Sequence, residues 1–155
     1  MTASLPNSGD LVGSRRRILV TGGAGFIGGA VVRRLLRESD VIVFNLDKMG
    51  YASDLTSIEE ELTTLGSDQA DRHQLLKVDL ANADAVRDAV QVADPDLVMH
   101  LAAESHVDRS IAGPGVFIES NVTGTYNLLQ AVRDHHEGLS GERQTQFRLH
   151  HISTD

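Results

Sequence analysis

The 155-residue sequence contains no cysteine, and acidic side chains outnumber basic ones. The absence of cysteine excludes a disulfide framework and any metal site with cysteine ligands. The formal net charge of −8 argues against a general nucleic-acid binder, because phosphate contacts need clustered lysine and arginine. No apolar run approaches the roughly 18–20 residues that span a membrane. We therefore expect neither nucleic acid nor a membrane as a partner.

The first 14 residues are small, polar and interrupted by glycine and proline. We expect a flexible leader over residues 1–16 and one domain over residues 17–155. The arginines at residues 15–17 superficially suggest a twin-arginine export signal. The apolar stretch after them is rich in glycine and no small-residue cleavage site follows, so we expect a cytoplasmic protein.

Short apolar segments alternate with helical patterns along the rest of the chain. Five apolar runs predict buried strands at residues 17–21, 41–46, 75–80, 97–101 and 147–152. Helical patterns lie between them, at residues 26–37, 54–65, about 82–92 and 116–133, and residues 138–144 should form a soft connector. Because crossovers between parallel strands are right-handed, this order predicts an α/β fold. We expect a Rossmann-type, doubly wound parallel sheet with helices on both faces.

A glycine-rich segment at residues 21–29, TGGAGFIGG, joins the first strand to the first helix. Gly22, Gly25 and Gly28 form the pattern G-x-x-G-x-x-G, which differs in spacing from the generic G-x-G-x-x-G fingerprint. Glycine permits a tight turn, close backbone approach and free N–H groups at a helix N-terminus, all of which a phosphate needs. The strand–loop–helix context predicts a dinucleotide site. The alternative is a turn that merely lets the helix pack closely on the strand.

An acidic residue, Asp47, stands at the end of the second strand, 19 positions after Gly28. A carboxylate there can accept hydrogen bonds from both hydroxyls of an adenosine ribose, and it repels a 2′-phosphate. Asp47 therefore favours NAD over NADP, although the neighbouring Lys48 weakens this discrimination. Asp79 and Leu80 end the third strand at the same edge and could flank an adenine ring. Taken alone, Asp79 is better explained as a strand-end cap.

The histidines do not predict a metal site. His135–His136 and His150–His151 are adjacent pairs, and adjacent side chains diverge on a helix and point to opposite faces of a strand. We interpret His106 as structural.

Four longer stretches narrow the interpretation: ILVTGGAGFIG, LDKMGYASDL, MHLAAESHVDRSIAGPGVFIESNVTGTYNLLQA and FRLHHISTD. Together they resemble the dTDP-glucose 4,6-dehydratases of the extended short-chain dehydrogenase/reductase superfamily, over about residues 17–155. The family usually has a hydroxyl residue where Gly50 stands, so one cofactor contact differs from the family pattern. Other nucleotide-sugar dehydratases and 4-epimerases share the glycine loop and remain alternatives, as does a non-catalytic NAD-binding module.

The resemblance implies NAD as cofactor and dTDP-glucose as the nucleotide-sugar substrate. Hydride would leave C4 of the sugar, water would be lost across C5–C6, and hydride would return to C6, giving dTDP-4-keto-6-deoxyglucose. Ser105 and Thr154 would contact the substrate, and Asp155 would be the catalytic acid. The cofactor-binding residues are Gly22, Gly25, Phe26, Ile27, Gly28, Asp47, Lys48, Met49, Gly50, Asp79, Leu80, Leu101, Ala102, Ala103, Glu104, Ser105 and Ser120.

The superfamily's usual catalytic base is a tyrosine four positions before a lysine, and this pair is absent. The sequence has two lysines, Lys48 and Lys77, and neither has a tyrosine at that spacing. The family's glutamate base would come directly after Asp155. We therefore expect the chain to be the N-terminal part of a longer homodimeric lyase, with weak NAD affinity at most and no turnover by itself. A pure NAD sensor would have no use for the substrate-side motifs HLAAESHVDRSI and STD.

Overall fold

In the described part of the chain, five parallel strands form one sheet in the order β3-β2-β1-β4-β5. The computed structural model describes residues 15–106, 108, 111 and 113–153. Its strands are β1 (Arg16–Thr21), β2 (Val41–Asp47), β3 (His73–Lys77), β4 (Leu97–His100) and β5 (Arg148–His151). The chain winds outward from β1 to β3 and then continues from β4 on the other side of β1, so the strand order reverses beside the central strand. The predicted parallel, doubly wound sheet is confirmed. Residues 1–14 of the predicted leader lie outside the described residues.

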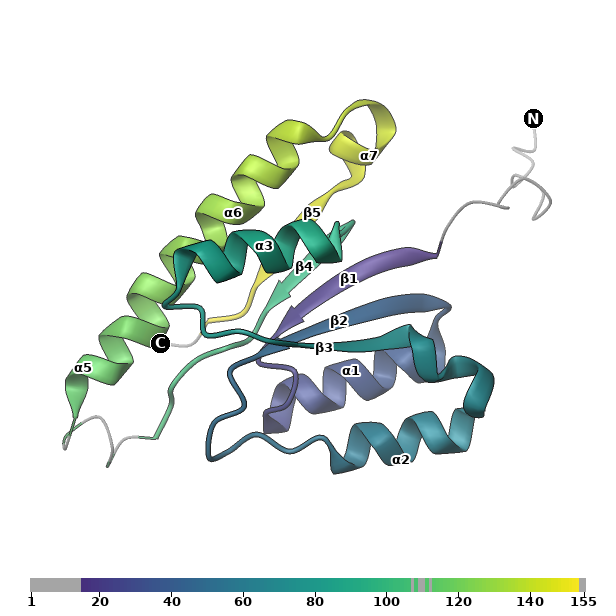
Figure 1. Ribbon diagram of the computed structural model, residues 1–155, viewed down its shortest axis with the longest axis horizontal. Coiled ribbons are helices and arrows are strands. Elements are labelled where there is room, and N and C mark those ends of the chain that lie inside the picture. Colours follow the sequence, from purple (N-terminus) through teal and green to yellow (C-terminus); the bar gives the residue numbers. More distant parts are fainter. Residues whose placement is uncertain (1–14, 107, 109–110, 112, 154–155) are drawn as a thin grey trace, which may run out of the picture.

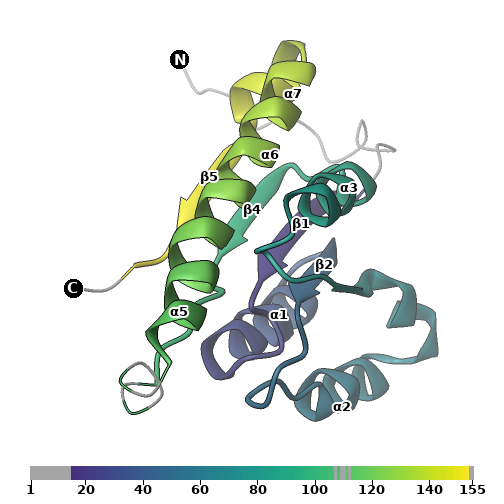
Figure 2. The same ribbon diagram turned by 60° about the vertical axis from the view of Figure 1, so that its left-hand side comes forward.

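Helices cover both faces of the sheet, as predicted (Figure 1). α1 (Phe26–Glu38) and α2 (Thr56–Leu65) lie below the sheet in this view, and α3 (Ala83–Ala93) and α6 (Thr125–Gly138) lie above it. Figure 2 shows the same two layers from the side. None of the helices in the described part of the chain has the length and hydrophobicity of a membrane span.

The core has two halves because neighbouring side chains of β1 point to opposite faces of the sheet. Ile18 and Val20 pack with α1 and α2, whereas Leu19 packs with α3 and α6. A strand that is covered on both sides must be apolar at nearly every position. This is why the sequence of β1 does not alternate between polar and apolar residues.

The predicted helix over residues 116–133 is not one regular α-helix. It consists of α5 (Pro114–Phe117), a π-helical segment η2 (Ile118–Gly124) and α6. A π-helix places one more residue in each hydrogen-bonded turn than an α-helix does. Gly124 ends this segment against Leu80, and a Cβ atom built on Gly124 would lie 2.8 Å from the Leu80 Cβ. The end of η2 therefore packs against the segment that follows β3.

Three other expectations differ from the structure. The third strand is β3 at His73–Lys77 and not residues 75–80, because the chain leaves the ladder soon after it passes Asp47. The connector expected over residues 138–144 contains the short helix α7 (Gly141–Gln146). The fifth strand was predicted to be buried, but Arg148, His150 and His151 are exposed because β5 is the edge strand of the sheet.

The structure also contains η1 (Ser67–Arg72), a 3₁₀-helix that the sequence patterns did not predict. Its last residue, Arg72, is buried and donates hydrogen bonds to the carbonyl oxygens of Val41, Leu36 and Ser39. These bonds compensate the cost of burying the guanidinium and fasten η1 to the start of β2.

Candidate functional site

The predicted site residues that the structure describes gather at the edge of the sheet where the parallel strands end, toward the left in Figure 1. β1 leads into the glycine loop at Gly22, β2 into Lys48 and β4 into Leu101. Since β2 and β4 are the two neighbours of β1, the loops after them flank the glycine loop. In open α/β sheets ligands bind at such a reversal of strand order. We call the region bordered by residues 22–25, 47–51 and 101–106 the crevice.

The glycine loop is packed so closely that two of its glycines admit no side chain. Gly22 has a positive φ of 71°, and an added Cβ atom would lie 2.7 Å from the Ala102 Cα. A Cβ atom on Gly28 would lie 2.0 Å from the Gly22 carbonyl oxygen. Close packing alone thus explains why residues 22 and 28 are glycines. Any role of the loop in ligand binding must therefore lie in the groups that it presents to its surroundings.

What the loop presents is the uncapped N-terminus of α1. The N-cap residue, Gly25, provides no side-chain hydrogen bond, and the first turn contains no acidic residue. The first N–H groups of a helix have no intrahelical acceptor and carry a partial positive charge. The flanking side chains of Phe26 and Ile27 are 96% and 64% exposed, so they do not fold back over this end of the helix. Such a helix terminus suits a phosphate or pyrophosphate group.

Asp47 joins the glycine loop to the loop after β2. Its side chain is largely buried, with 7% exposure. The Oδ2 atom accepts a hydrogen bond from the Ala24 N–H at 3.1 Å, and Oδ1 accepts bonds from the Met49 N–H and the Ser53 hydroxyl, each at 2.8 Å. A carboxylate oxygen has about two lone-pair sites. Oδ2 therefore retains capacity for a ligand hydroxyl beside the glycine loop.

Lys48 and Met49 leave the end of β2 in different ways. Met49 adopts a left-handed conformation, with φ of 57°, that directs its N–H toward Asp47. Gly50 follows and accepts a backbone hydrogen bond from Ser53 at 3.1 Å. Lys48 extends across to the segment after β4, where its ammonium group lies 2.6 Å from the Glu104 carboxylate and 3.2 Å from the Ser120 hydroxyl.

The segment after β4 continues the strand's direction along the glycine loop. The Leu101 N–H donates to the Thr21 carbonyl oxygen, and the Ala102 N–H donates to the Thr21 hydroxyl, each at 3.2 Å. The Ala102 backbone faces Gly22, which explains why residue 22 carries no side chain. Ala103 and Ser105 are exposed. This segment forms one wall of the crevice.

Asp79 and Leu80 lie beyond the end of β3, in the turn that leads to α3. The Asp79 carboxylate accepts a hydrogen bond from the Ala81 N–H at 2.9 Å, so Asp79 caps this turn. The Leu80 side chain belongs to the hydrophobic core, and its carbonyl oxygen accepts a bond from Asn127. Both residues are near the edge of the sheet, with the Leu80 side chain directed inward.

Sequence reasoning missed His100, the last residue of β4. The imidazole is 1% exposed, and it lies between two threonine hydroxyls, 2.6 Å from Thr21 and 3.0 Å from Thr125. Burial, together with the nearby His151, lowers the pKa of His100 to about 4. The neutral ring thus links β1, β4 and α6 beneath the crevice. The signal in the sequence was a histidine that ends an apolar strand, Leu-Val-Met-His.

Two further contacts were also missed. Asn45 is fully buried in β2 under the glycine loop, and a Cβ atom on Gly23 would lie 2.2 Å from its Oδ1 atom. An asparagine within the run Val-Ile-Val-Phe-Asn was the available signal. His106 forms a hydrogen bond with the Tyr51 hydroxyl at 2.7 Å, a second link between the loops after β2 and β4.

Two predicted residues, Thr154 and Asp155, lie outside the described residues. Within the described part of the chain, no group of three or more histidine, aspartate or glutamate side chains is arranged to hold a metal ion.

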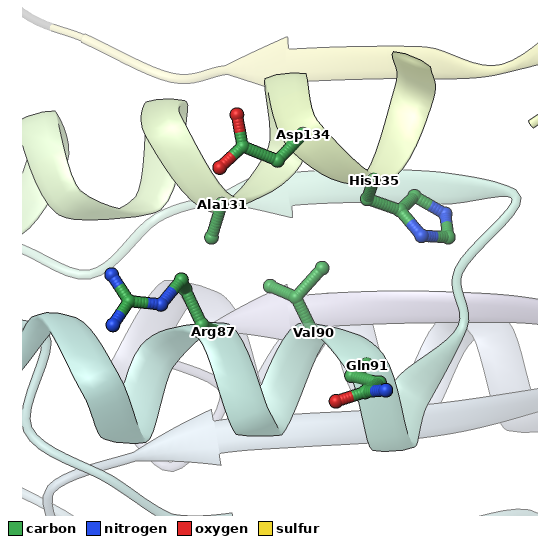
Figure 3. A pocket seen from close by; sticks show the side chains of 6 residues that line it. All are labelled: Arg87, Val90, Gln91, Ala131, Asp134 and His135. Atoms are coloured by element: carbon green, nitrogen blue, oxygen red, sulfur yellow. The ribbon is translucent and has the colours of Figure 1, made fainter. Parts of the chain in front are cut away.

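A separate hollow of about 190 Å³ lies between α3 and α6. Figure 3 shows Ala131, Asp134 and His135 of α6 facing Arg87, Val90 and Gln91 of α3. Its charged side chains are engaged by neighbours, Arg87 with Asp84 and Asp134 with Arg133. The hollow shares no residue with the crevice at the edge of the sheet, and we assign the candidate site to that crevice.

The residues of the crevice fit the chemistry of a dinucleotide. The start of α1 offers N–H groups and a partial positive charge for a pyrophosphate, and Asp47 offers a carboxylate beside it for a ribose. The glycine loop holds the two features together through the hydrogen bond from Ala24 to Asp47.

Comparison with known proteins gives consistent matches. The family model for GDP-mannose 4,6 dehydratase matches residues 19–155. The dTDP-glucose 4,6-dehydratase of Shigella flexneri is 48% identical over 139 residues, and the one of Escherichia coli K12 is 46% identical over the same length. These matches cover 90% of the chain but 37% of each relative, so the chain spans less than two fifths of their length.

Solved structures agree with these matches. The structure of dTDP-glucose 4,6-dehydratase from Streptomyces venezuelae, which has NAD bound, matches with a TM-score of 0.66 and 40% identity, covering 77% of this chain and 36% of that one. UDP-glucose 4-epimerase from Thermus thermophilus, in complex with NAD, matches with a TM-score of 0.63 and 33% identity, covering 77% and 34%. The resemblance to dTDP-glucose 4,6-dehydratases that the sequence motifs predicted is confirmed.

Proposed function

Because the chain belongs to the GDP-mannose 4,6 dehydratase family, we propose that it is the NAD-binding part of a nucleotide-sugar 4,6-dehydratase. The observation that carries the proposal is the pairing of the uncapped α1 terminus with the Asp47 carboxylate. One can bind a pyrophosphate and the other a ribose, and a single hydrogen-bonded loop joins them. NAD, when bound, would accept and return the hydride.

The substrate we propose is dTDP-glucose. The family takes its name from a GDP-mannose enzyme, whereas the curated relatives at 46–48% identity are dTDP-glucose 4,6-dehydratases. The likeness to a UDP-glucose 4-epimerase reflects the shared dinucleotide-binding fold. We assign the substrate contacts to Ser105 and Thr154 and the acid for the departing hydroxyl to Asp155, as the family resemblance implies.

The remaining crevice residues would position the cofactor. The backbone N–H groups of Phe26 and Ile27 would bind the pyrophosphate. Residues 47–50 would surround the adenosine ribose, and Asp79 and Leu80 would lie beside the adenine. Leu101, Ala102, Ala103, Glu104 and Ser105, together with Ser120, would line the nicotinamide side.

The intact protein would be a homodimer. An apolar stripe, consisting of Ile118, Val122, Tyr126 and Leu129, is exposed along η2 and α6. Residues at this spacing lie on one side of a helical segment. A second copy of the same stripe would cover it in a two-fold symmetric interface.

Isothermal titration calorimetry of the 155-residue chain with NAD+ and NADP+ tests the proposal. We expect NAD+ to bind and Asp47→Asn to weaken it about tenfold or more, because a hydrogen bond to a charged group contributes about 1.5–3 kcal/mol. Asp134→Asn, in the hollow between α3 and α6, is the matched control and should bind NAD+ as the unmodified chain does.

Circular dichroism would verify that both variants fold. Tighter binding of NADP+ than of NAD+ to the unmodified chain would contradict the role of Asp47. An equal loss of NAD+ affinity in the two variants would contradict the location of the site.

A further inference from the structure

A lysine directly after the ribose-binding carboxylate raises a question of cofactor selectivity. NADP carries a 2′-phosphate on the adenosine ribose, and a cation near this position favours it. Asp47 disfavours the 2′-phosphate by charge repulsion, but Lys48 is the next residue and bears a flexible ammonium group. From the sequence alone, Asp47 favours NAD and Lys48 favours NADP, and the two effects oppose each other.

The structure shows which groups the Lys48 ammonium contacts. The ammonium group lies 2.6 Å from Glu104 Oε1 and 3.2 Å from the Ser120 hydroxyl. Glu104 comes from the segment after β4, 56 positions away in the sequence, and Ser120 comes from η2. Lys48 is thus directed across the crevice to the opposite loop.

Glu104 is well placed to hold this lysine. Its side chain is only 13% exposed, compared with 35% for Lys48. The backbone on both sides of its Cα atom is fixed by Asn121, which accepts a hydrogen bond from the Glu104 N–H at 2.8 Å and donates one to the Glu104 carbonyl oxygen at 2.9 Å. The Glu104 main chain is therefore held in place, and its carboxylate is largely enclosed.

A second contact keeps the two loops at this distance. The Tyr51 hydroxyl and His106 Nδ1 are 2.7 Å apart, and their rings meet edge to face. Both links join the loop after β2 to the segment after β4, with the glycine loop between them. To reach a 2′-phosphate, Lys48 would have to break a charged hydrogen bond and leave a mostly buried carboxylate unpaired, which is unfavourable.

We infer that Glu104 is a specificity-determining residue, which holds the Lys48 ammonium away from the adenosine 2′ position and so sharpens the preference for NAD over NADP. The inference rests on the proposed function, because it concerns the same dinucleotide site. Glu104 acts through Lys48 and need not touch the 2′ position itself.

The test is the ratio of the dissociation constants of NADP+ and NAD+, measured by calorimetry on the 155-residue chain. Glu104→Gln removes the charge that holds Lys48, and we expect the ratio to fall about tenfold, the change that corresponds to one charged hydrogen bond. The double variant Lys48→Met/Glu104→Gln no longer has the cation, and its ratio should return to about that of the unmodified chain.

Two more variants complete the design. Ser120→Ala removes the second partner of Lys48 and leaves the carboxylate in place, so it should lower the ratio by a smaller factor. It also provides a readout if Glu104→Gln does not fold. Glu38→Gln breaks the exposed pair between Arg34 and Glu38, at 2.8 Å, and should leave the ratio unchanged.

The outcomes separate the two proposals. Suppose that the unmodified chain binds NAD+ and that neither Glu104→Gln nor Ser120→Ala changes the ratio from its value in the unmodified chain. The inference about Glu104 is then wrong, and the proposed function stands. An equal fall in the single and the double variant would also overturn it, because the effect would not pass through Lys48. If the unmodified chain binds neither dinucleotide, the proposed function fails and this inference fails with it.

Discussion

At the scale of single residues, His100 shows how a buried polar group can organise a site that it does not enter. The ring lies between the hydroxyls of Thr21 and Thr125, and Thr21 in turn accepts a hydrogen bond from Ala102. A neutral imidazole has one donor and one acceptor nitrogen, so one threonine donates to it and the other accepts from it. His100 thereby fixes the wall of the crevice from beneath.

The low pKa of His100, about 4, predicts a loss of stability in mild acid. Between pH 6.5 and 4 the unfolded chain binds a proton at this residue and the folded chain does not, so the free energy of unfolding decreases as the pH falls. The loss from His100 reaches about 3 kcal/mol near pH 4. Burial also lowers the pKa of His73, which acts in the same direction.

Urea unfolding of the unmodified chain and of His100→Gln, at pH 7 and pH 5, measures this effect. We expect His100→Gln to be less stable at pH 7, because the link between the two threonines is weakened, but to lose less stability between the two pH values. His150→Gln, in the exposed edge strand, retains His100 and should keep the original pH dependence. Identical pH dependence in His100→Gln and the unmodified chain would contradict the assignment.

At the scale of elements, α3 shows how a local signal in the sequence fixes the start of a helix. α3 begins after Asn82, whose side chain accepts a hydrogen bond from the Ala85 N–H at 3.1 Å, and it ends at Asp94 in a left-handed conformation. This helix packs on the sheet and against α6, with Val86 and Val90 in the core. The start of α3 is therefore fixed both by its cap and by burial.

Removal of the α3 cap has a predictable cost. Asn82→Ala should lower the free energy of unfolding by about 1 kcal/mol, because the Ala85 N–H loses its acceptor. Asn82→Asp retains an acceptor oxygen and should stay close to the stability of the unmodified chain. Urea denaturation at pH 7 distinguishes the variants, and equal stability of all three chains would show that the cap does not stabilise α3.

At the scale of the whole molecule, both faces of the sheet are covered, but among the described residues an apolar stripe along η2 and α6 is exposed. The apolar stripe along η2 and α6 includes Val122 and Leu129, which are 58% and 41% exposed. Water contact with a continuous row of such side chains is unfavourable, and covering them with a second copy removes that cost. The geometry of the stripe thus supports the proposed homodimer.

Sedimentation velocity tests this interface. We expect the unmodified chain to dimerise and Val122→Glu/Leu129→Glu to sediment as a monomer, because two carboxylates would be buried without partners in the interface. Val92→Glu, on α3, is the matched control, since Val92 is 57% exposed and lies outside the stripe. Monomers of the unmodified chain at all concentrations, or dimers of the double variant, would refute this interface.

Residues close together in the chain allowed much of the fold to be predicted from the sequence. The apolar run of β1, the glycine loop and the periodic pattern of α1 are all local, so the order of elements followed from composition and spacing. Asp47 could be identified because its position at the end of β2 is a local feature as well. The predictions failed where contacts were remote: η2 adapts to Leu80, and β5 is exposed because it is an edge strand.

The sequence by itself determined a parallel α/β sheet with a glycine loop and an acidic residue at the end of its second strand. Only the tertiary structure decided the partners of Lys48 and His100. The reason is that β2 and β4 become neighbours of β1 from opposite sides, which brings Lys48 within 2.6 Å of a glutamate 56 positions away. The spacing of residues along the chain cannot predict such a contact. The effect of the Lys48 charge on a ligand therefore depends on its pairing with the Glu104 carboxylate.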